Sequence, residues 1–301
     1  PLPFKRLVVA WVSLTILLGA LLLFAAEAPA LSFMDALFIS CNAVTSTGLA
    51  SFNISRFSVG SQVLVAILVQ LGSSTLILTV PVALRLYAIN RLIPPQARRL
   101  NLHDLRRVPQ WFVDREAGLL LLKVVAAYHV LIYAFGFVLL AVGFAIQPTG
   151  ERGVCGYLAP SNETRPFECS PIGFAAFHTI SAFNNAGFSI VPSSLTPFAD
   201  NGVVLFGIAL LVMAGNVLFP VLLRYVVAAC SRFTSESSPR QVYLRYLLIN
   251  SRRFIPYIFS PQQTALLLCA QLCLLLAQAF VSCMGSKDSS ICRQWWFMAV
   301  M

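Results

Sequence analysis

The hydrophobic residues of this chain gather in long apolar stretches separated by short polar connections. Five stretches approach the roughly 20 residues that a helix needs to cross the hydrocarbon core of a bilayer. They are Leu7–Ala26, Ser61–Tyr87, Ala117–Ile146, Gly202–Ala229 and Pro261–Met284. Two further apolar segments, Phe33–Val44 and Ile172–Phe183, are only about a dozen residues long. The pattern predicts five spanning helices and two re-entrant helices that enter the membrane without crossing it.

The two short segments belong to a duplicated unit. Phe33–Arg85 can be laid over Ile172–Arg224 without a gap, at a constant offset of 139 residues. The residues that match at this offset include Ala36 and Ala175, Phe38 and Phe177, Ala43 and Ala182, Gly48 and Gly187, Ser55 and Ser194, Val65 and Val204, Pro81 and Pro220, and Arg85 and Arg224. The offset of 139 residues indicates a repeating unit far longer than a solenoid repeat. The duplication predicts a repeated element made of a span, a re-entrant helix, a return segment and a second span.

A polar return segment with a glycine follows each short helix. The first is Thr45-Ser46-Thr47-Gly48-Leu49, and the second is Asn184-Asn185-Ala186-Gly187-Phe188. A dehydrated alkali cation needs backbone carbonyls turned toward it, and glycine permits the torsions that align them. We therefore predict that both segments line an ion filter. For one glycine alone, simple helix termination is the alternative, and the two asparagines either brace the filter or satisfy local backbone groups.

The polar residues before each short helix predict where it begins. Ser32 with Asp35 resembles a capping box, and Ser170 before Pro171 fits an N-cap followed by proline at the first helical position. With these starts, the C-terminal ends of both helices point toward the membrane interior. A helix C-terminus carries roughly half a negative charge, so two such ends favour cations over anions.

Composition assigns the chain to the membrane. It has 58% hydrophobic and 11% charged residues and a mean hydropathy of +0.80, whereas soluble domains carry about 25% charged residues. Most arginines lie in two connections, between the second and third spans and between the fourth and fifth. Short basic loops stay on the cytoplasmic side, which predicts a cytoplasmic N-terminus. These loops explain the net charge of +10, so we expect the lipid bilayer as a partner and no nucleic acid.

These patterns predict an all-α polytopic membrane protein built from membrane-pore-membrane units. The predicted parts are a first repeat at 1–88, a basic cytoplasmic loop at 89–116, a second repeat at 117–229, a second basic loop at 230–260, and the start of a third repeat at 261–301.

The motifs resemble those of the Trk/Ktr/HKT superfamily of potassium and sodium transporters. Asp35–Phe38 with Ala43–Leu49, and Ser181–Phe188, are similar to its first two pore loops, and Gly215–Arg224 is similar to the inner helix of the second repeat in its eukaryotic Trk and HKT members. The resemblance implies four units around a pseudo-fourfold, potassium-channel-like pore, of which this chain completes two. It also implies a plasma-membrane location, homodimers, and transported K⁺ or Na⁺ with no cofactor.

In that superfamily, a glycine at the first filter position accompanies potassium selectivity, and a serine there favours sodium. Gly48 therefore favours K⁺ transport, with sodium or mixed transport as the alternative. A chain that begins with Pro1 and ends in the opening turns of a third pore helix is expected to be a fragment of a longer protein. A non-conducting membrane scaffold or receptor is the alternative from another class. No enzyme is expected, because the chain lacks a catalytic motif.

Residues of the predicted outer side carry further predictions. Cys155 and Cys169 lie where disulfides persist and are a candidate pair. Asn162 begins an Asn-Glu-Thr pattern typical of a glycosylation acceptor. His178, inside the second short helix, is expected to hydrogen-bond a neighbouring helix rather than bind a metal.

Overall fold

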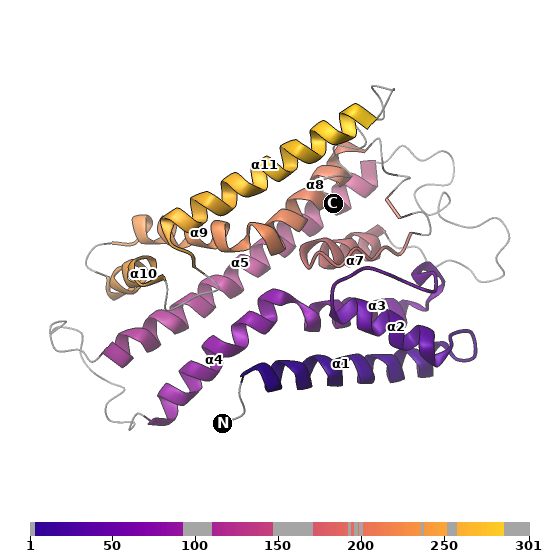
Figure 1. The fold of residues 1–301 in the computed structure, drawn as a ribbon, viewed down its shortest axis with the longest axis horizontal. Helices are drawn as coiled ribbons and strands as arrows, with labels where there is room; N and C mark the ends of the chain where they lie inside the picture. The colour runs from indigo at the N-terminus through magenta and orange to yellow at the C-terminus, as the bar shows by residue number, and fades with distance from the viewer. Residues whose placement is uncertain are drawn as a thin grey trace. The chain divides into compact units, whose positions relative to one another are not determined.

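The computed structural model describes residues 4–92, 110–146, 171–191, 194, 195, 198, 201–235, 238–251 and 258–285. Within these residues every regular element is a helix (Figure 1). The α-helices are α1 (Phe4–Glu27), α2 (Phe33–Val44), α3 (Val59–Gly72), α4 (Ser74–Leu92), α5 (Gln110–Ile146), α7 (Pro171–Phe183), α8 (Gly202–Val212), α9 (Phe219–Phe233), α10 (Pro239–Ile249) and α11 (Pro261–Gly285). A 3₁₀ turn at Ile54–Arg56 and a π-helix at Met213–Val217 complete them. The predicted all-α class is confirmed.

Two helices are each long and apolar enough to cross a membrane, Arg6–Glu27 within α1 and Gln110–Ile146, which is α5. The pairs α3/α4 and α8/α9 meet the same test if each bent pair is one span, which gives up to four spans in the described part of the chain. As predicted, α2 and α7 are apolar but short. The fifth predicted span, Pro261–Met284, forms α11, and its crossing of the membrane stays a prediction.

The second predicted span is not one continuous helix. The apolar pattern predicts a single helix over Ser61–Tyr87, but α3 ends at Gly72 and α4 begins at Ser74. Between them Ser73 leaves the helical region, with φ −51° and ψ 129°. Its hydroxyl forms a buried 2.7 Å hydrogen bond with the Thr75 hydroxyl, so the polar groups at the break are satisfied.

The fourth predicted span is also interrupted. Its helix turns into the π-helix at Met213–Val217 and restarts as α9 at Phe219. Pro220 lies in the first turn of α9. Proline has no N–H to donate, and in a continuous helix its ring would clash with the carbonyl four residues earlier, here that of Asn216. A helix can begin beside Pro220 but cannot run through it undisturbed.

The chain forms two compact units. The first consists of Pro1–Ile77, Ile132–Asn216 and Cys273–Met301, and the second consists of Leu78–Leu131 and Val217–Leu272. The first unit contains α2, α7 and both return segments, so it includes residues of both predicted repeats. The candidate site therefore lies wholly within one unit.

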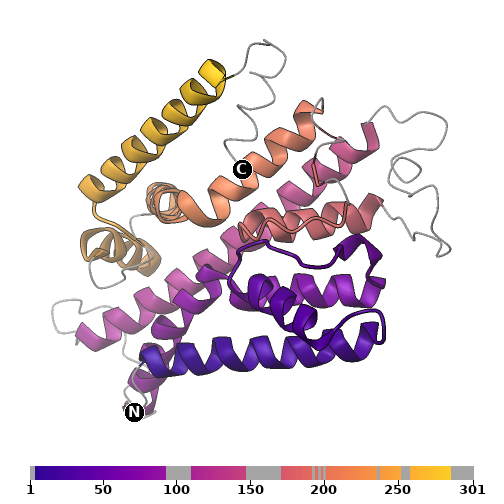
Figure 2. The ribbon, with the colours of Figure 1, turned by 45° about the vertical axis from the view of Figure 1, so that its right-hand side comes forward.

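In the first unit, α2 packs against α1 and α3 (Figure 2). Ala36, Ile39 and Ala43 of α2 are fully buried. The Ser40 hydroxyl donates a 2.8 Å hydrogen bond to the Ile16 carbonyl of α1, which satisfies a polar side chain inside the bundle. The short helix is therefore held on two sides by longer helices.

The other short helix, α7, packs against α8 and also contacts α3 of the first repeat. Phe144 of α5 fills the space beside α7, with its ring centroid 6.3 Å from that of Phe174 and 5.0 Å from that of Phe198. All three rings are buried. The contact between α3 and α7 joins the two repeats next to the return segments.

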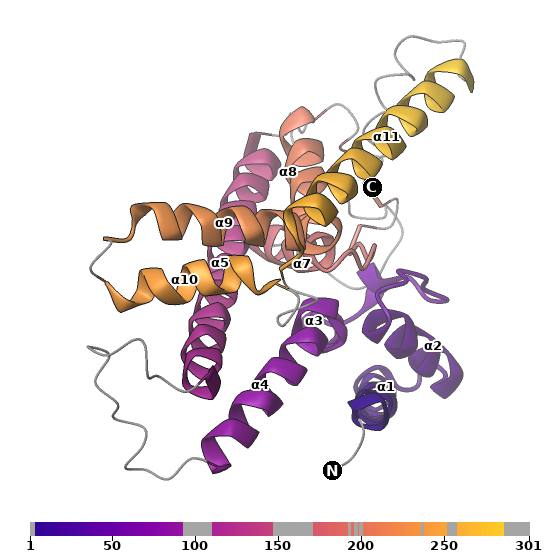
Figure 3. The same ribbon diagram turned by 60° about the vertical axis from the view of Figure 1, so that its left-hand side comes forward.

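In the second unit, the duplicated arginines link helix ends in similar ways. Arg85 of α4 lies 3.0 Å from Asp114 near the start of α5, and Asp114 also accepts a 2.5 Å hydrogen bond from Tyr246. Arg224 of α9 donates a 2.6 Å hydrogen bond to the Phe259 carbonyl, just before α11. In both repeats the arginine thus ties the inner helix, which is α3/α4 in the first repeat and α8/α9 in the second, to the start of a later helix, α5 or α11. Tyr246 belongs to α10, which lies beside α9 (Figure 3).

Candidate functional site

The two return segments have the same backbone conformation. Ser46 and Asn185 both have φ 53°, and Gly48 and Gly187 have φ 73° and 72°. Each pair is separated by the 139-residue offset of the duplication. A left-handed φ is rare for residues other than glycine and asparagine, so its occurrence twice at matching positions shows that the duplication extends to the backbone of the return segments.

The hydrogen bonds that end the short helices match in the same way. In the first repeat they run from Thr45 N to Cys41 O, from Ser46 N to Ala43 O and from Thr47 N to Asn42 O, at 2.9, 3.3 and 3.0 Å. In the second repeat they run from Asn184 N to Ile180 O, from Asn185 N to Ala182 O and from Ala186 N to Ser181 O, at 3.1, 3.0 and 2.8 Å. Each return segment therefore leaves its helix through the same turn and begins at the negative end of the helix dipole.

The opposite end of α2 is capped as predicted. Ser32 is the N-cap, and its hydroxyl oxygen accepts from the Asp35 N–H at 3.1 Å. The same hydroxyl donates to Asp35 Oδ2 at 2.6 Å, and this hydrogen bond lowers the pKa of the Asp35 carboxyl from its ordinary value. A carboxylate in the first helical turn suits the positive end of the dipole. In the second repeat Pro171 begins α7, and the predicted cap Ser170 lies outside the described residues.

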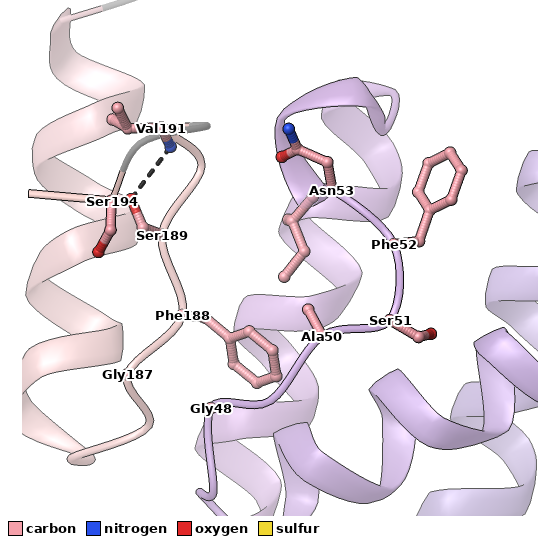
Figure 4. Close-up of a pocket in the computed structure, with 11 residues that line it drawn as sticks. Gly48, Ala50, Ser51, Phe52, Asn53, Gly187, Phe188, Ser189, Val191 and Ser194 are labelled. Carbon is pink, nitrogen blue, oxygen red and sulfur yellow. Dashed lines mark hydrogen bonds between the residues drawn. The ribbon is translucent and has the colours of Figure 1, made fainter.

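The two return segments approach each other at their glycines (Figure 4). A Cβ placed on Gly48 would lie 2.5 Å from the Ala186 carbonyl oxygen and 3.1 Å from Gly187 Cα. A Cβ placed on Gly187 would meet nothing closer than Gly48 Cα, at 3.6 Å. The structure thus brings the two predicted filter glycines together, and the approach is tighter on the Gly48 side.

Two other glycines let the inner helices contact the ends of the short helices. A Cβ on Gly72 of α3 would overlap the carbonyl of Val44, the last residue of α2. A Cβ on Gly215 would overlap the carbonyl of Phe183, the last residue of α7. Val44 and Phe183 occupy the same position in the duplication, but the glycines differ by four residues in that register, about one helical turn. The contact is therefore repeated, although the glycine that makes it is displaced.

Side chains behind the second segment hold it in place. The buried Ser181 hydroxyl donates a 2.7 Å hydrogen bond to the Phe188 carbonyl. His178 Nδ1 bonds the Phe174 carbonyl at 2.9 Å, which makes it a donor, so the Nε2 of a neutral ring accepts from the Ser189 hydroxyl at 3.0 Å. Ser189 Oγ in turn accepts from the Val191 N–H at 3.0 Å (Figure 4). His178 thus bonds its own helix and Ser189, just after the return segment, and not a neighbouring helix as predicted.

The predicted filter residues differ in exposure. Thr45, Thr47, Leu49, Asn185 and Gly187 are exposed. Ser46 and Gly48 are half-buried, while Asn184, Ala186 and Phe188 are buried. Asn184 bonds polar side chains and the Ile180 carbonyl, whereas Asn185 takes the left-handed conformation.

A pocket of about 440 Å³ opens beside the two glycines. Its lining includes both glycines, Phe188, and residues that follow each return segment, among them Asn53 of the first repeat and Ser189 of the second (Figure 4). The pocket therefore adjoins both return segments and has polar and apolar side chains in its lining.

Several sequence predictions lie outside the described residues. These are the candidate disulfide between Cys155 and Cys169 and the glycosylation pattern at Asn162. Among the residues that the structure does describe, no three histidine, cysteine or acidic side chains gather closely enough to hold a metal ion.

Sequence reasoning did not identify two residues that bond Asn184, namely Gln70 and Tyr133. The available signal was polarity, because Gln70 interrupts an otherwise apolar stretch of α3. Such residues inside membrane segments usually bond a neighbouring helix, but the sequence did not show which one.

These features define an integral membrane protein in which two short apolar helices carry paired glycine-containing return segments. The chain belongs to the TrkH family, described as a cation transport protein, whose match covers residues 2–294. The predicted resemblance to Trk/Ktr/HKT proteins is confirmed. Members of this family are ion transporters, which agrees with the prediction that the chain is not an enzyme.

Three relatives carry potassium in their names. Ktr system potassium uptake protein B of Vibrio alginolyticus is 27% identical over 193 residues, which cover 64% of this chain and 37% of that protein. The protein of the same name from Bacillus subtilis is 27% identical over 214 residues, covering 69% and 42%. Potassium transporter TRK1 of Candida albicans is 27% identical over 167 residues, covering 55% and 15%. The matched part of the chain spans less than half the length of each relative.

Proposed function

We propose that the protein moves K⁺ across a membrane through a filter lined by backbone carbonyls of Thr45–Gly48 and Asn184–Gly187. The observation that carries this proposal is the matching backbone of the two segments, with the same left-handed φ at two positions of each. Their approach at Gly48 and Gly187 supports a shared ion path. The potassium uptake functions in the names of its relatives favour K⁺ as the cargo.

The electrostatics of the two short helices suit a cation. Each return segment begins at a helix C-terminus, where roughly half a negative charge is concentrated. The described return segments contain no ionisable side chain, so binding relies on carbonyl dipoles, as in known potassium filters. The proposed ion path therefore needs neither a cofactor nor proton transfer.

Two segments supply half of a fourfold filter. The other half comes either from chain beyond these two repeats or from a second polypeptide. We also propose a cytoplasmic N-terminus, because the basic connections favour that orientation. The proposed plasma-membrane location follows from the family resemblance alone. A homodimer of the complete protein is part of this proposal.

Expression of the full-length protein in cells that lack their own potassium uptake tests the proposal. We expect growth on low potassium to be restored and uptake of Rb⁺, a tracer for K⁺, to rise at least tenfold over cells without the protein. We also expect a tenfold excess of Na⁺ to inhibit this uptake little. Inhibition by equimolar Na⁺ would favour the sodium or mixed alternative. Surface expression without any cation uptake would overturn the proposal in favour of a scaffold.

A further inference from the structure

Three polar side chains meet behind the second return segment, all within the first unit. They are Gln70 of α3, Tyr133 of α5 and Asn184 at the end of α7. Tyr133 donates to Gln70 Oε1 at 2.5 Å, while Asn184 Nδ2 lies 3.0 Å from both Gln70 Oε1 and the Tyr133 hydroxyl oxygen. We call these residues the inter-repeat cluster, because α3 belongs to the first repeat and the other two residues belong to the second.

The hydrogen bonds of the inter-repeat cluster are mutually compatible. The Tyr133 hydroxyl gives its proton to Gln70, so its oxygen is left to accept from the Asn184 amide. Gln70 Oε1 has two lone pairs and accepts from both partners. The two hydrogens of Asn184 Nδ2 are shared among these two oxygens and the Ile180 carbonyl, which lies 2.9 Å away, one turn earlier in α7. In a low-dielectric interior, such a connected network favours one arrangement of its members.

The inter-repeat cluster bears directly on the filter. Asn184 is the first residue of the return segment, only three residues before Gly187, and it is buried. The Tyr133 ring lies against the Phe183 ring with centroids 4.6 Å apart. The end of α7 is thus held from one side by Tyr133 and tied to the first repeat by Gln70.

The first return segment has no such cluster in the described structure. Its matching residue, Thr45, is exposed and bonds the Cys41 carbonyl of its own helix and the Thr47 hydroxyl. The residue that matches Gln70 in the second repeat is Ala209, which has no side-chain hydrogen-bonding group. The cluster is therefore a feature of one junction, between the inner helix of the first repeat and the filter of the second.

We propose that Gln70 and Tyr133 are positioning residues that act through Asn184 to fix the second filter segment relative to the first repeat, and so set the preference for K⁺ over Na⁺. This inference rests on the proposed function. A small displacement of Asn184 would shift the carbonyls that follow it, and discrimination between cations depends on the arrangement of those carbonyls. A merely structural cluster would affect stability and leave ion preference unchanged.

A double-mutant cycle in the full-length protein tests this inference. Tyr133→Phe keeps the ring against Phe183 but removes the hydroxyl, and Gln70→Met keeps a side chain of similar length without a strong acceptor. At matched surface abundance, each variant is expected to lower the K⁺-over-Na⁺ preference of uptake five- to tenfold. The double variant is expected to lose no more than either single variant, because both changes break one network. Tyr87→Phe, at an exposed tyrosine of α4, is the matched control and should leave the preference unchanged.

The outcomes separate this inference from the proposed function. If both single variants transported K⁺ at the wild-type rate and with an unchanged preference for K⁺ over Na⁺, the inference would be overturned. The proposed function would not be affected. Additive losses in the double variant would also overturn it, because the residues would then act independently. Absence of cation transport by the wild-type protein would overturn the proposed function and the inference with it.

Discussion

Gly48→Ala is expected to abolish potassium transport, while Gly187→Ala is expected to reduce it by about tenfold. Both glycines have a left-handed φ, which costs an alanine roughly 1–2 kcal/mol, and about 1.4 kcal/mol corresponds to a factor of ten. Only at Gly48 does the added Cβ also meet backbone, since it would lie 2.5 Å from the Ala186 carbonyl oxygen. Relief of this overlap requires the two return segments to move apart.

The measurement is Rb⁺ uptake by cells that express each variant of the full-length protein, normalised to surface abundance. Gly202→Ala is the control, because a Cβ there has nothing within 4 Å. A loss of more than a hundredfold for Gly48→Ala beside a modest loss for Gly187→Ala would agree with the structure. Equal effects at the two glycines would show that the asymmetric approach does not govern conduction.

Gly72→Ala and Gly215→Ala are expected to destabilise the folded protein by about 3 kcal/mol each. At both positions the new methyl group would overlap a backbone carbonyl, that of Val44 or that of Phe183. Backbone cannot rotate away as a flexible side chain can, so the inner helix must shift from the short helix. We expect the Tm of the purified full-length protein to fall by on the order of 10 °C.

Gly60→Ala is the control variant for this thermal measurement. Gly60→Ala places its methyl group on the same helix as Gly72 but no closer than 4.0 Å to the Ser58 hydroxyl. Its Tm should remain within about 2 °C of the wild-type value, because surface helical substitutions have small effects. If the Gly72→Ala and Gly60→Ala variants had the same Tm, close packing of α3 on the end of α2 would not contribute to stability.

The duplication is the part of the fold that the sequence predicts best. It located both short helices, and it placed Gly48 and Gly187 at matching positions that the structure gives the same torsions. The prediction was correct because a glycine after an apolar helix too short to cross the membrane is a local signal. The duplication shows this signal twice, at matching positions. The capping role of Ser32 was equally local.

The interruptions of the inner helices were harder to predict. Hydropathy treats Ser61–Tyr87 as continuous, because a short polar run such as Ser73-Ser74-Thr75 between apolar residues does not by itself end a helix. The break at Ser73 accompanies the contact of Gly72 with Val44, which is a tertiary feature. Pro220 did offer a local signal for the second break, because proline disfavours the interior of a helix. Its counterpart Pro81 nevertheless lies inside the unbroken helix α4, so proline alone does not decide where a break occurs.

The inter-repeat cluster was beyond the reach of sequence patterns. Gln70, Tyr133 and Asn184 are separated by 51 to 114 residues along the chain. No periodicity connects them, and the duplication does not help because Gln70 and Asn184 match Ala209 and Thr45. Tertiary packing, including that of α3 against α7, brings them together.

Crystals of the full-length protein soaked in Rb⁺ would show whether the return segments bind a cation, because the anomalous signal of the ion reports where it binds. We expect Rb⁺ peaks beside the carbonyls of Thr45–Gly48 and Asn184–Gly187, where the two glycines approach each other. If a transport-competent protein bound Rb⁺ only at sites away from these segments, they would not be the ion filter.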